Sequence, residues 1–493
     1  MKMKYLLGID FGGGASKATL LGEDGVIAAT HTTEYKTSYP KFGYAEQEPD
    51  DWFDATVENI SGVLAKSGIS AGDIVALSLD AATHTAVITD ENFNVIRPAI
   101  YWTDTRSTKE VAYLKENYSD LIDRMVLHKP DTIWSLPELL WIKNNEPENW
   151  KRVKKILFAK DYVRHRLTGD YVTDYIEAEG SMMFDINTMK WSEELCAVLD
   201  LDTAIMPKIV KPSDIVGHIT RDAAKLTGLF EGTPVLCGTT DTVMEVFASG
   251  AVKKGQMTLK LATAGRICVV TDKPYPDINL INYSHIIDGC FYPGTATKSC
   301  AASYRWFRDT FGGDYAELDK MAEEIEIGSE GLVFHPYLNG ELTPYANPKL
   351  CADFVGVRSS HGKGHFVRAV LEGVAMSMLD CKTTLDGLGI PHNDSAVIIG
   401  GGGKSPLWRQ MISDALGIEL TEMKYADSSF GSAMLAGIAA GIFKSPEDAV
   451  SKCNSVVSRT TPDFDNTKKY KELFKKYKAI QKALEPIYNG EQV

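Results

Sequence analysis

A formal charge of −14, from 66 acidic and 52 basic residues in a chain of 493, has the wrong sign for a protein whose main partner is a nucleic acid. The 44% of hydrophobic and 24% of charged residues are typical of a globular protein, and no low-complexity tract interrupts them. Because the length exceeds what one hydrophobic core usually serves, we expect two domains of similar size with a ligand site in the cleft between them.

The eight cysteines form no CxxC pair and no compact framework, which is typical of reduced, mostly buried thiols. The apolar run at 5–9 is too short for a signal peptide, and no stretch approaches the length of a membrane span. These features predict a cytoplasmic protein that has no membrane partner.

The first elements read as an antiparallel meander. Three short strands are expected at 5–9, 18–21 and 26–30, joined by turns at Gly12–Gly14 and Asp24-Gly25. A helix is expected next at 51–67, from its spacing of apolar residues, and a buried strand at 74–79. Alternating helices and strands indicate the α/β class.

A second strand pair, at 259–262 and 267–270, is interrupted by Thr263-Ala264-Gly265 and resembles the first meander. We therefore place a domain boundary near residue 250, which gives domains at 1–250 and 251–493 that share one architecture.

A third glycine segment, Gly400–Gly403, follows a predicted strand at 397–399 and precedes a helix at 407–416. A glycine loop that leads into a helix N-terminus supplies free backbone donors. The last predicted element is a helix at 466–486 with one apolar face, and it is expected to dock by that face.

Asp10 ends the first strand directly before Gly12–Gly14, so a backbone that can approach a phosphate lies beside a carboxylate that could hold Mg2+. One glycine hairpin is usually only a turn, but three glycine loops in one chain are harder to explain in that way. The sequence contains no GxxxxGK[ST], and no GxGxxG opens a helix after the first strand, which argues against the P-loop and Rossmann classes.

Asp241 follows a predicted strand at 234–236 and precedes a small-residue helix at 243–248. A role as helix N-cap is sufficient to explain an aspartate at this position. The crowd of hydroxyl residues around it favours a second interpretation, in which the carboxylate accepts a proton from a substrate hydroxyl.

Small groups of polar residues directly follow two predicted buried strands. Such side chains can bind sugar hydroxyls, with Asp accepting, Arg donating and Trp offering a flat apolar face. A buried, hydrogen-bonded histidine and a structural Asp–Arg ion pair are the competing explanations, and taken separately they carry more weight. The residues are Thr83, His84, Trp102, Asp104 and Arg106.

Together these segments resemble the FGGY carbohydrate kinases, and among them the xylulokinases most. The resemblance covers nearly the whole chain. The matching stretches are Gly8–Gly12, Ile100–Arg106, Lys160–Tyr162 through Thr168-Gly169, Gly238–Thr242, Pro336–Glu341, Val367–Gly373 and Gly400–Gln410.

The resemblance implies two domains of the actin-like, ribonuclease-H-like ATPase fold, with the sugar bound mainly by the first domain, ATP bound between the two, and the second domain supplying ATP contacts. It implies that Asp241 is the base that deprotonates the sugar hydroxyl, and that Asp10 and Asp241 hold Mg2+. The implied sugar contacts are Thr83, His84, Trp102, Asp104 and Thr242. The implied nucleotide contacts are Gly12, Gly13, Gly14, Thr263, Gly265, Gly401, Gly402 and Ser405.

The chain departs from the family pattern close to the expected sugar contacts. Ala82-Thr83-His84-Thr85 stands where xylulokinases carry Gln-Met-His-Gly, and Thr242 replaces the Asn that usually follows the catalytic Asp. Leu342 replaces a common Arg, and Gly13-Gly14 replaces Thr-Ser in the first phosphate loop. The departures therefore affect the identity of the substrate more than the reaction.

The expected activity is phosphorylation of a small sugar by ATP, with D-xylulose to D-xylulose 5-phosphate as the first choice. Ribulose, erythrulose, L-xylulose and glycerol are alternative substrates. From other classes, an actin-like ATPase that exchanges partners and a catalytically silent sugar sensor stay open. A homodimer is possible by analogy with similar kinases.

Overall fold

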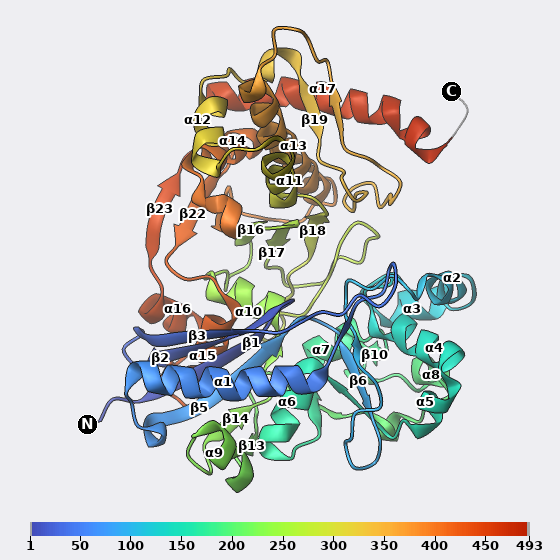
Figure 1. Cartoon of the computed structure of the whole chain (residues 1–493), viewed down its shortest axis with the longest axis vertical. Helices are drawn as coiled ribbons and strands as arrows, with labels where there is room; N and C mark the ends of the chain where they lie inside the picture. The colour runs from blue at the N-terminus through green and yellow to red at the C-terminus, as the bar shows by residue number, and fades with distance from the viewer. Residues whose placement is uncertain (1, 491–493) are drawn as a thin grey trace. The chain divides into compact units, whose positions relative to one another are not determined.

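The computed structural model describes residues 2–490, which form two compact units (Figure 1). The first unit takes the chain up to Gly250 and adds two later segments, 283–288 and 425–454. The second unit consists of 251–282, 289–424 and the chain from Ser455 onward. The predicted single division after residue 250 therefore omits two returns of the chain to the first unit.

The sheet of the first unit begins with the predicted meander. Strands β1 (Tyr5–Phe11), β2 (Ala15–Gly22) and β3 (Ile27–Glu34) pair antiparallel. On the other side of β1, β5 (Ile74–Ala81) and β14 (Pro234–Leu236) run parallel to it, and β13 (Ile215–His218) closes the sheet antiparallel. The order is β13-β14-β5-β1-β2-β3, with short β15 (Thr239–Thr240) also pairing β5.

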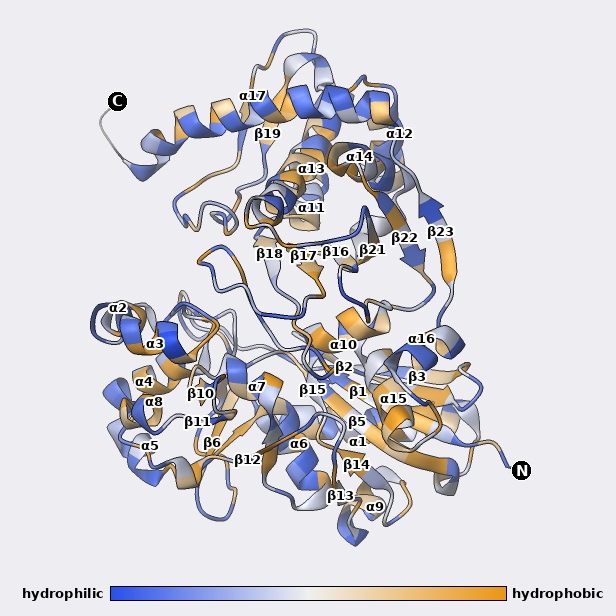
Figure 2. Ribbon diagram, turned by 180° about the vertical axis from the view of Figure 1, so that it is seen from behind, coloured by the Kyte–Doolittle hydropathy of each residue, from blue (hydrophilic) through white to orange (hydrophobic). Residues whose placement is uncertain are grey.

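Helices cover both faces of this sheet. Helix α1 (Pro49–Ser67) lies on one face and α15 (Ser428–Ala439) on the other, as the opposite views of Figures 1 and 2 show. Helix α1 begins two residues before the prediction, because Pro49 fits the first helical turn and Asp50 and Asp51 favour the positive helix N-terminus.

A large insertion after β5 builds the rest of the first unit. Its main elements are β6 (Ala86–Thr89), β7 (Ala99–Ile100), α2 (Thr108–Asn117), α3 (Ser119–Met125), α4 (Ser135–Asn145), α5 (Pro147–Arg152), β8 (Lys155–Phe158), α6 (Ala159–Thr168), β9 (Val172–Asp174), α7 (Tyr175–Gly180), α8 (Glu193–Ala197) and β12 (Lys208–Val210). After the insertion, α9 (Arg221–Thr227) connects β13 to β14, and α10 (Asp241–Ala248) follows β15. Short β4 (Glu46–Gln47) pairs β7, β10 (Phe184–Asp185) pairs β11 (Lys190–Trp191), and α16 (Pro446–Cys453) follows α15.

The second unit repeats the same sheet. Strands β16 (Met257–Leu261), β17 (Gly265–Val269) and β18 (Gly294–Thr297) form an antiparallel meander. Strands β21 (Ser395–Ile399) and β22 (Glu419–Met423) then run parallel to β16, and β23 (Val456–Thr460) closes the sheet antiparallel. The order β18-β17-β16-β21-β22-β23 matches that of the first sheet read from β3 to β13, which confirms the predicted repeat.

Long helices bury apolar side chains against this second sheet, and Figure 2 shows hydrophobic residues concentrated in the strands and in α13. The terminal helix α17 (Phe464–Asn489) buries Tyr470 and Tyr477, as its predicted apolar face requires. The other elements are α11 (Ala301–Phe311), α12 (Tyr315–Glu323), β19 (Val333–His335), β20 (Asp353–Val355), α13 (Lys363–Gly387) and α14 (Pro406–Leu416). Within residues 2–490, no helix has both the length and the apolar character of a membrane span.

Candidate active site

Asp10, at the end of β1, is one of several neighbouring carboxylates in the first unit. Burial is the main cause that raises the pKa of Asp10 to about 7, and the negative charge of Asp241 adds to the increase. Hydrogen bonds with Asp80 and Ser428 act in the opposite direction. One oxygen of Asp10, Oδ1, is buried and accepts no hydrogen bond within the described chain. A bound cation would stabilise this carboxylate, because its free oxygen lies among groups of the same negative charge.

Asp80 is the neighbour of Asp10 in the parallel register of β5 with β1, and the sequence prediction missed it. It is fully buried, and Ser432 Oγ of α15 donates to its Oδ2 over 2.5 Å. Burial and the charge of Asp10 raise the pKa of Asp80 well above its usual range. An acidic residue near the end of a buried, otherwise apolar strand was the signal that could have identified it.

Asp241 is the first residue of α10, so the helix begins two residues earlier than predicted. The N-cap position belongs to Thr240, which corrects the alternative interpretation of Asp241 as N-cap. Thr242 Oγ1 donates to Asp241 Oδ1 over 3.2 Å, and both side chains stay partly exposed. A helix N-terminus favours negative charge, which suits a carboxylate that must act as a proton acceptor.

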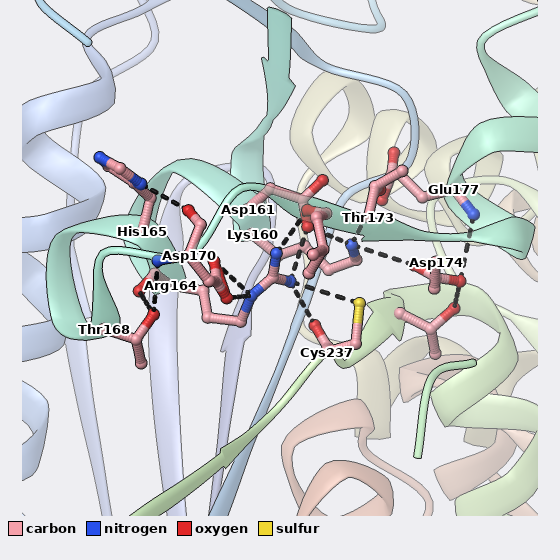
Figure 3. A network of polar contacts seen from close by, with 12 residues as sticks. Lys160, Asp161, Arg164, His165, Thr168, Asp170, Thr173, Asp174, Glu177 and Cys237 are labelled. Atoms are coloured by element: carbon pink, nitrogen blue, oxygen red, sulfur yellow. Dashed lines mark hydrogen bonds and ion pairs between the residues drawn. The ribbon is translucent and has the colours of Figure 1, made fainter. Parts of the chain in front are cut away.

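A buried network of charged residues supports the segment that leads into Asp241 (Figure 3). Arg164, which is fully buried, donates to the carbonyl of Cys237 over 2.6 Å and pairs with Asp161 and Asp170 at 2.7 and 2.6 Å. The Thr239 hydroxyl donates to Asp174 over 2.8 Å. Both contacts hold backbone and side-chain atoms within four residues of Asp241.

The hairpin Gly12–Gly14 connects β1 to β2 beside Asp10. Gly13 and Gly14 are exposed, and the carbonyl of Gly13 accepts from Thr37 and Gln47 at 3.1 and 3.0 Å. A Cβ at Gly13 would lie 2.8 Å from the hydroxyl of Tyr101, so a side chain there would displace the tyrosine. The hairpin is thus held in place while its outer backbone faces solvent.

His84 follows β5 and is buried with a positive φ of 70°, an unusual backbone conformation for this residue type. Its Nε2 lies 2.6 Å from Tyr283 Oη, and its backbone N–H donates to Glu177 over 2.8 Å. Its ring also contacts Trp134, with 4.8 Å between centroids. Tyr283, Trp134 and Glu177 are functional candidates that the sequence prediction missed.

Thr83 lies next to His84 and is half-buried, whereas Trp102 is 42% exposed and offers an open aromatic face. Asp104 is buried in a bidentate ion pair with Arg106 and accepts the N–H of Ala45 over 2.6 Å. Asp104 therefore forms the structural ion pair with Arg106 that was the competing explanation. A direct sugar contact by this residue stays a prediction.

The second unit holds the other two glycine loops, each within its own structural context. Thr263 is exposed in the β16–β17 turn, and a Cβ at Gly265 would lie 2.7 Å from Met378 Sδ and Thr297 Cγ2. Gly401 has open space around it, whereas Gly402 packs on Trp408. These loops form a hairpin and a 3-10 turn, and a side chain at Gly265 or Gly402 would disturb them.

Ser405 is the N-cap of α14. Its Oγ accepts from the N–H of Trp408 over 3.1 Å and donates to Asp319 over 2.7 Å. Across residues 2–490, no cluster of three or more His, Cys, Asp or Glu side chains is suited to hold a metal. A metal in the first unit would therefore rely on one or two carboxylates, as Mg2+ commonly does.

The repeated sheet, with a glycine-containing turn after the first strand of each unit and Asp10 near the end of β1, is consistent with the actin-like ATPase fold. Sequence profiles described as the FGGY family of carbohydrate kinases match residues 5–248 for the N-terminal domain and 268–440 for the C-terminal domain. The chain belongs to this family. It is a carbohydrate kinase that uses ATP as phosphate donor.

Relatives with this architecture differ in their substrates. The chain is 32% identical to a xylulose kinase of Bacillus subtilis, and the match covers 97% of each chain. It is 29% identical to a gluconokinase of Bacillus licheniformis, over 98% of this chain and 97% of that one. The crystal structure of xylulose kinase from Rhodospirillum rubrum superposes with a TM-score of 0.91 at 26% identity, covering 99% of this chain and all of that one. The two-domain fold predicted from the sequence is confirmed.

Proposed function

We propose that the chain phosphorylates D-xylulose to D-xylulose 5-phosphate, with Asp241 as general base. The observation that carries the proposal is the placement of Asp241 at the start of α10, where its charge acts on Asp10. The similarity to xylulose kinases supports the choice of sugar.

In this mechanism Asp241 accepts the proton of a sugar hydroxyl while the hydroxyl oxygen attacks the γ-phosphorus of ATP. The bond between that phosphorus and the ADP oxygen then breaks. Asp10 and Asp241 would hold Mg2+, which neutralises phosphate charge when bound. The unsatisfied Oδ1 of Asp10 fits such an ion. Gly12–Gly14 would offer backbone donors to the phosphates.

The remaining site residues keep their predicted roles as parts of the proposal. His84, Thr83, Trp102, Asp104 and Thr242 would contact the sugar. The nucleotide contacts of the second unit would be Thr263, Gly265, Gly401, Gly402 and Ser405. Cytoplasmic location and a homodimer stay predictions.

Gluconate is the second candidate substrate, because one of the relatives is a gluconokinase. Ribulose, erythrulose, L-xylulose and glycerol complete the set, since Thr83 and Thr242 depart from the xylulokinase pattern beside His84 and Asp241. A sugar with a carboxylate would need a positively charged partner that a ketose would not need.

The test is ATP consumption by purified protein with Mg2+ and each of these sugars, against a control without sugar. Stimulation by D-xylulose above all others supports the proposal. Stronger stimulation by another sugar keeps the mechanism and reassigns the substrate. ATP turnover that no sugar changes would contradict the proposed sugar substrates. It would favour the alternatives of an actin-like ATPase that exchanges partners or a catalytically silent sugar sensor.

A further inference from the structure

Helix α7, with its N-cap Asp174, carries three buried carboxyl groups within one and a half turns. Asp174, Glu177 and Glu179 are at most 3% exposed. Burying a carboxyl group is costly unless hydrogen bonds or ion pairs compensate it. A short helix with three such groups therefore needs a specific reason for each.

Each carboxyl group holds a different segment of the first unit. Asp174 Oδ1 accepts from Thr239 Oγ1 over 2.8 Å, two residues before Asp241. Glu177 Oε1 accepts from the backbone N–H of His84 over 2.8 Å. Glu179 accepts from Ser284 N–H and Oγ at 2.8 and 2.5 Å.

Two of these segments, the His84 loop and the Tyr283 segment, contact each other at His84. Tyr283, which precedes Ser284, lies 2.6 Å from His84 Nε2 through its hydroxyl. A Cβ at Gly180, at the end of α7, would lie 1.6 Å from His84 Cε1, so only glycine leaves room for the imidazole. Helix α7 thus packs directly against the histidine ring, and its carboxyl groups bind the backbone of His84 and of Ser284.

Lys160 supplies the positive charge that compensates Asp174. Lys160 Nζ lies 3.0 Å from Asp174 Oδ2 and 2.6 Å from Asp161 Oδ1, and all three side chains are fully buried (Figure 3). Asp174 can therefore accept from Thr239 with one oxygen while the other oxygen is paired. The arrangement gives Thr239 a fixed partner.

We propose that Asp174, Glu177 and Glu179 are positioning residues for the sugar site, and that they set the Asp241 segment, the His84 loop and the Tyr283 segment respectively. The inference rests on the proposed function, in which Asp241 is the base and His84 contacts the sugar. It predicts that damage to the Asp174 contact and damage to the Glu177 contact change different kinetic constants.

The first arm compares the same substitution at two adjacent buried threonines of β15. Thr239→Val removes the hydrogen bond to Asp174. We expect kcat to fall roughly tenfold or more with little change in sugar KM, because a small displacement of the base lowers the rate of the chemical step. Thr239→Ser keeps the hydroxyl and should restore kcat. Thr240→Val is the control, since the buried Thr240 hydroxyl has no hydrogen-bond partner among the described residues.

The second arm concerns Glu177. Glu177→Met removes the acceptor for the His84 N–H and should raise sugar KM roughly tenfold while ATP KM stays constant, whereas Glu177→Gln keeps an acceptor and should behave like wild type. Equal losses in Thr239→Val and Thr240→Val, or a Glu177→Met variant with unchanged sugar KM, would overturn the proposal.

Hydrogen–deuterium exchange separates failure of this inference from failure of the proposed function, since it needs no turnover. We expect faster exchange at 237–242 in Thr239→Val and at 82–86 in Glu177→Met, each without the other. Unchanged exchange at both segments rejects the positioning role even if the enzyme is active on some sugar. Changed exchange in a protein that no sugar stimulates keeps the positioning role and rejects the substrate.

Discussion

At the scale of single residues, Asp241 combines partial exposure with two features that suit a proton acceptor. It begins a helix, where negative charge is favoured, and the Thr242 hydroxyl donates to it over 3.2 Å. A base must be reachable by a substrate hydroxyl, and the fully buried Asp80 is not. Of the two aspartates, only Asp241 is exposed enough for the role of base in the proposed mechanism.

Asp241→Asn keeps the shape of the side chain and removes the proton acceptor. We expect sugar-dependent ATP turnover to fall by about 10²–10⁴-fold, the usual contribution of a general base, while sugar binding measured by calorimetry is largely retained. Asp222→Asn, at an exposed site on α9, is the matched control and should keep full turnover. Turnover close to wild type in Asp241→Asn would remove this residue from the mechanism.

Lys160 is the second residue whose removal has a clear expected effect. Lys160→Met leaves the buried Asp174 without its cation and leaves Asp161 paired with Arg164 alone, and we expect a loss of about 3–5 kcal/mol in the free energy of unfolding. Urea denaturation measures the change. Lys225→Met, which breaks the exposed pair with Asp222, should leave the unfolding curve nearly unchanged. Similar curves for both variants would show that the buried network does not stabilise the first unit.

At the scale of elements, the strands and helices that local signals predicted lie within a few residues of the observed ones, but many short elements had no prediction. The meander was predictable because alternating apolar residues and glycine or Asp-Gly turns are short-range features, and α17 because its apolar face repeats over many turns. The first turn of α10 was missed, since Asp241 and Thr242 have weak helix propensity and only the structure places them inside the helix.

Long-range pairing was not predictable from one sequence. His84 and Tyr283 are 199 positions apart, and no local pattern links them. The apolar sequence of α15 indicates a buried helix, but it does not indicate which of two similar sheets the helix covers. Asp104 and its ion pair with Arg106, two positions away, could both be proposed from the sequence, whereas its contact with the N–H of Ala45, 59 positions away, could not.

The packing of α15 on β1 depends on Gly8. A Cβ at this position would lie 1.9 Å from the carbonyl oxygen of Ser429. Gly8→Ala should therefore displace α15 and lower the free energy of unfolding by about 1–3 kcal/mol or more, the usual cost of overpacking. Gly72→Ala, where the nearest atom is 3.8 Å away, is the control in the same unit. Equal urea midpoints for the two variants would mean that α15 adjusts without cost.

At the scale of the whole molecule, several buried carboxyl groups retain protons to unusually high pH. Burial is the main cause that raises the pKa of Glu177 and Glu179 to about 8 in the first unit, and that of Glu341 to about 7 in the second. Between the ordinary value of 4.5 and these values, the folded chain binds more protons than the unfolded chain. These groups therefore make the protein less stable as pH rises through that range.

Glu179→Gln removes one of these groups while keeping a hydrogen-bond acceptor for Ser284. Relative to wild type, the free energy of unfolding of this variant should rise as pH increases from 4.5 towards about 8, and then stay level. Thermal or urea unfolding across this range measures the difference. A difference that does not depend on pH would show that Glu179 titrates alike in the folded and unfolded chains.

The return of residues 425–454 to the first unit has a consequence for biosynthesis. When residue 250 leaves the ribosome, β1 and β5 are present, but α15, which covers one face of their sheet, has not been made. Translation of the intervening segment of about 200 residues takes roughly 10–40 s at ordinary elongation rates of about 5–20 residues per second. During that time the nascent first unit exposes an apolar sheet face, which makes it a natural client for chaperones until its last helix arrives.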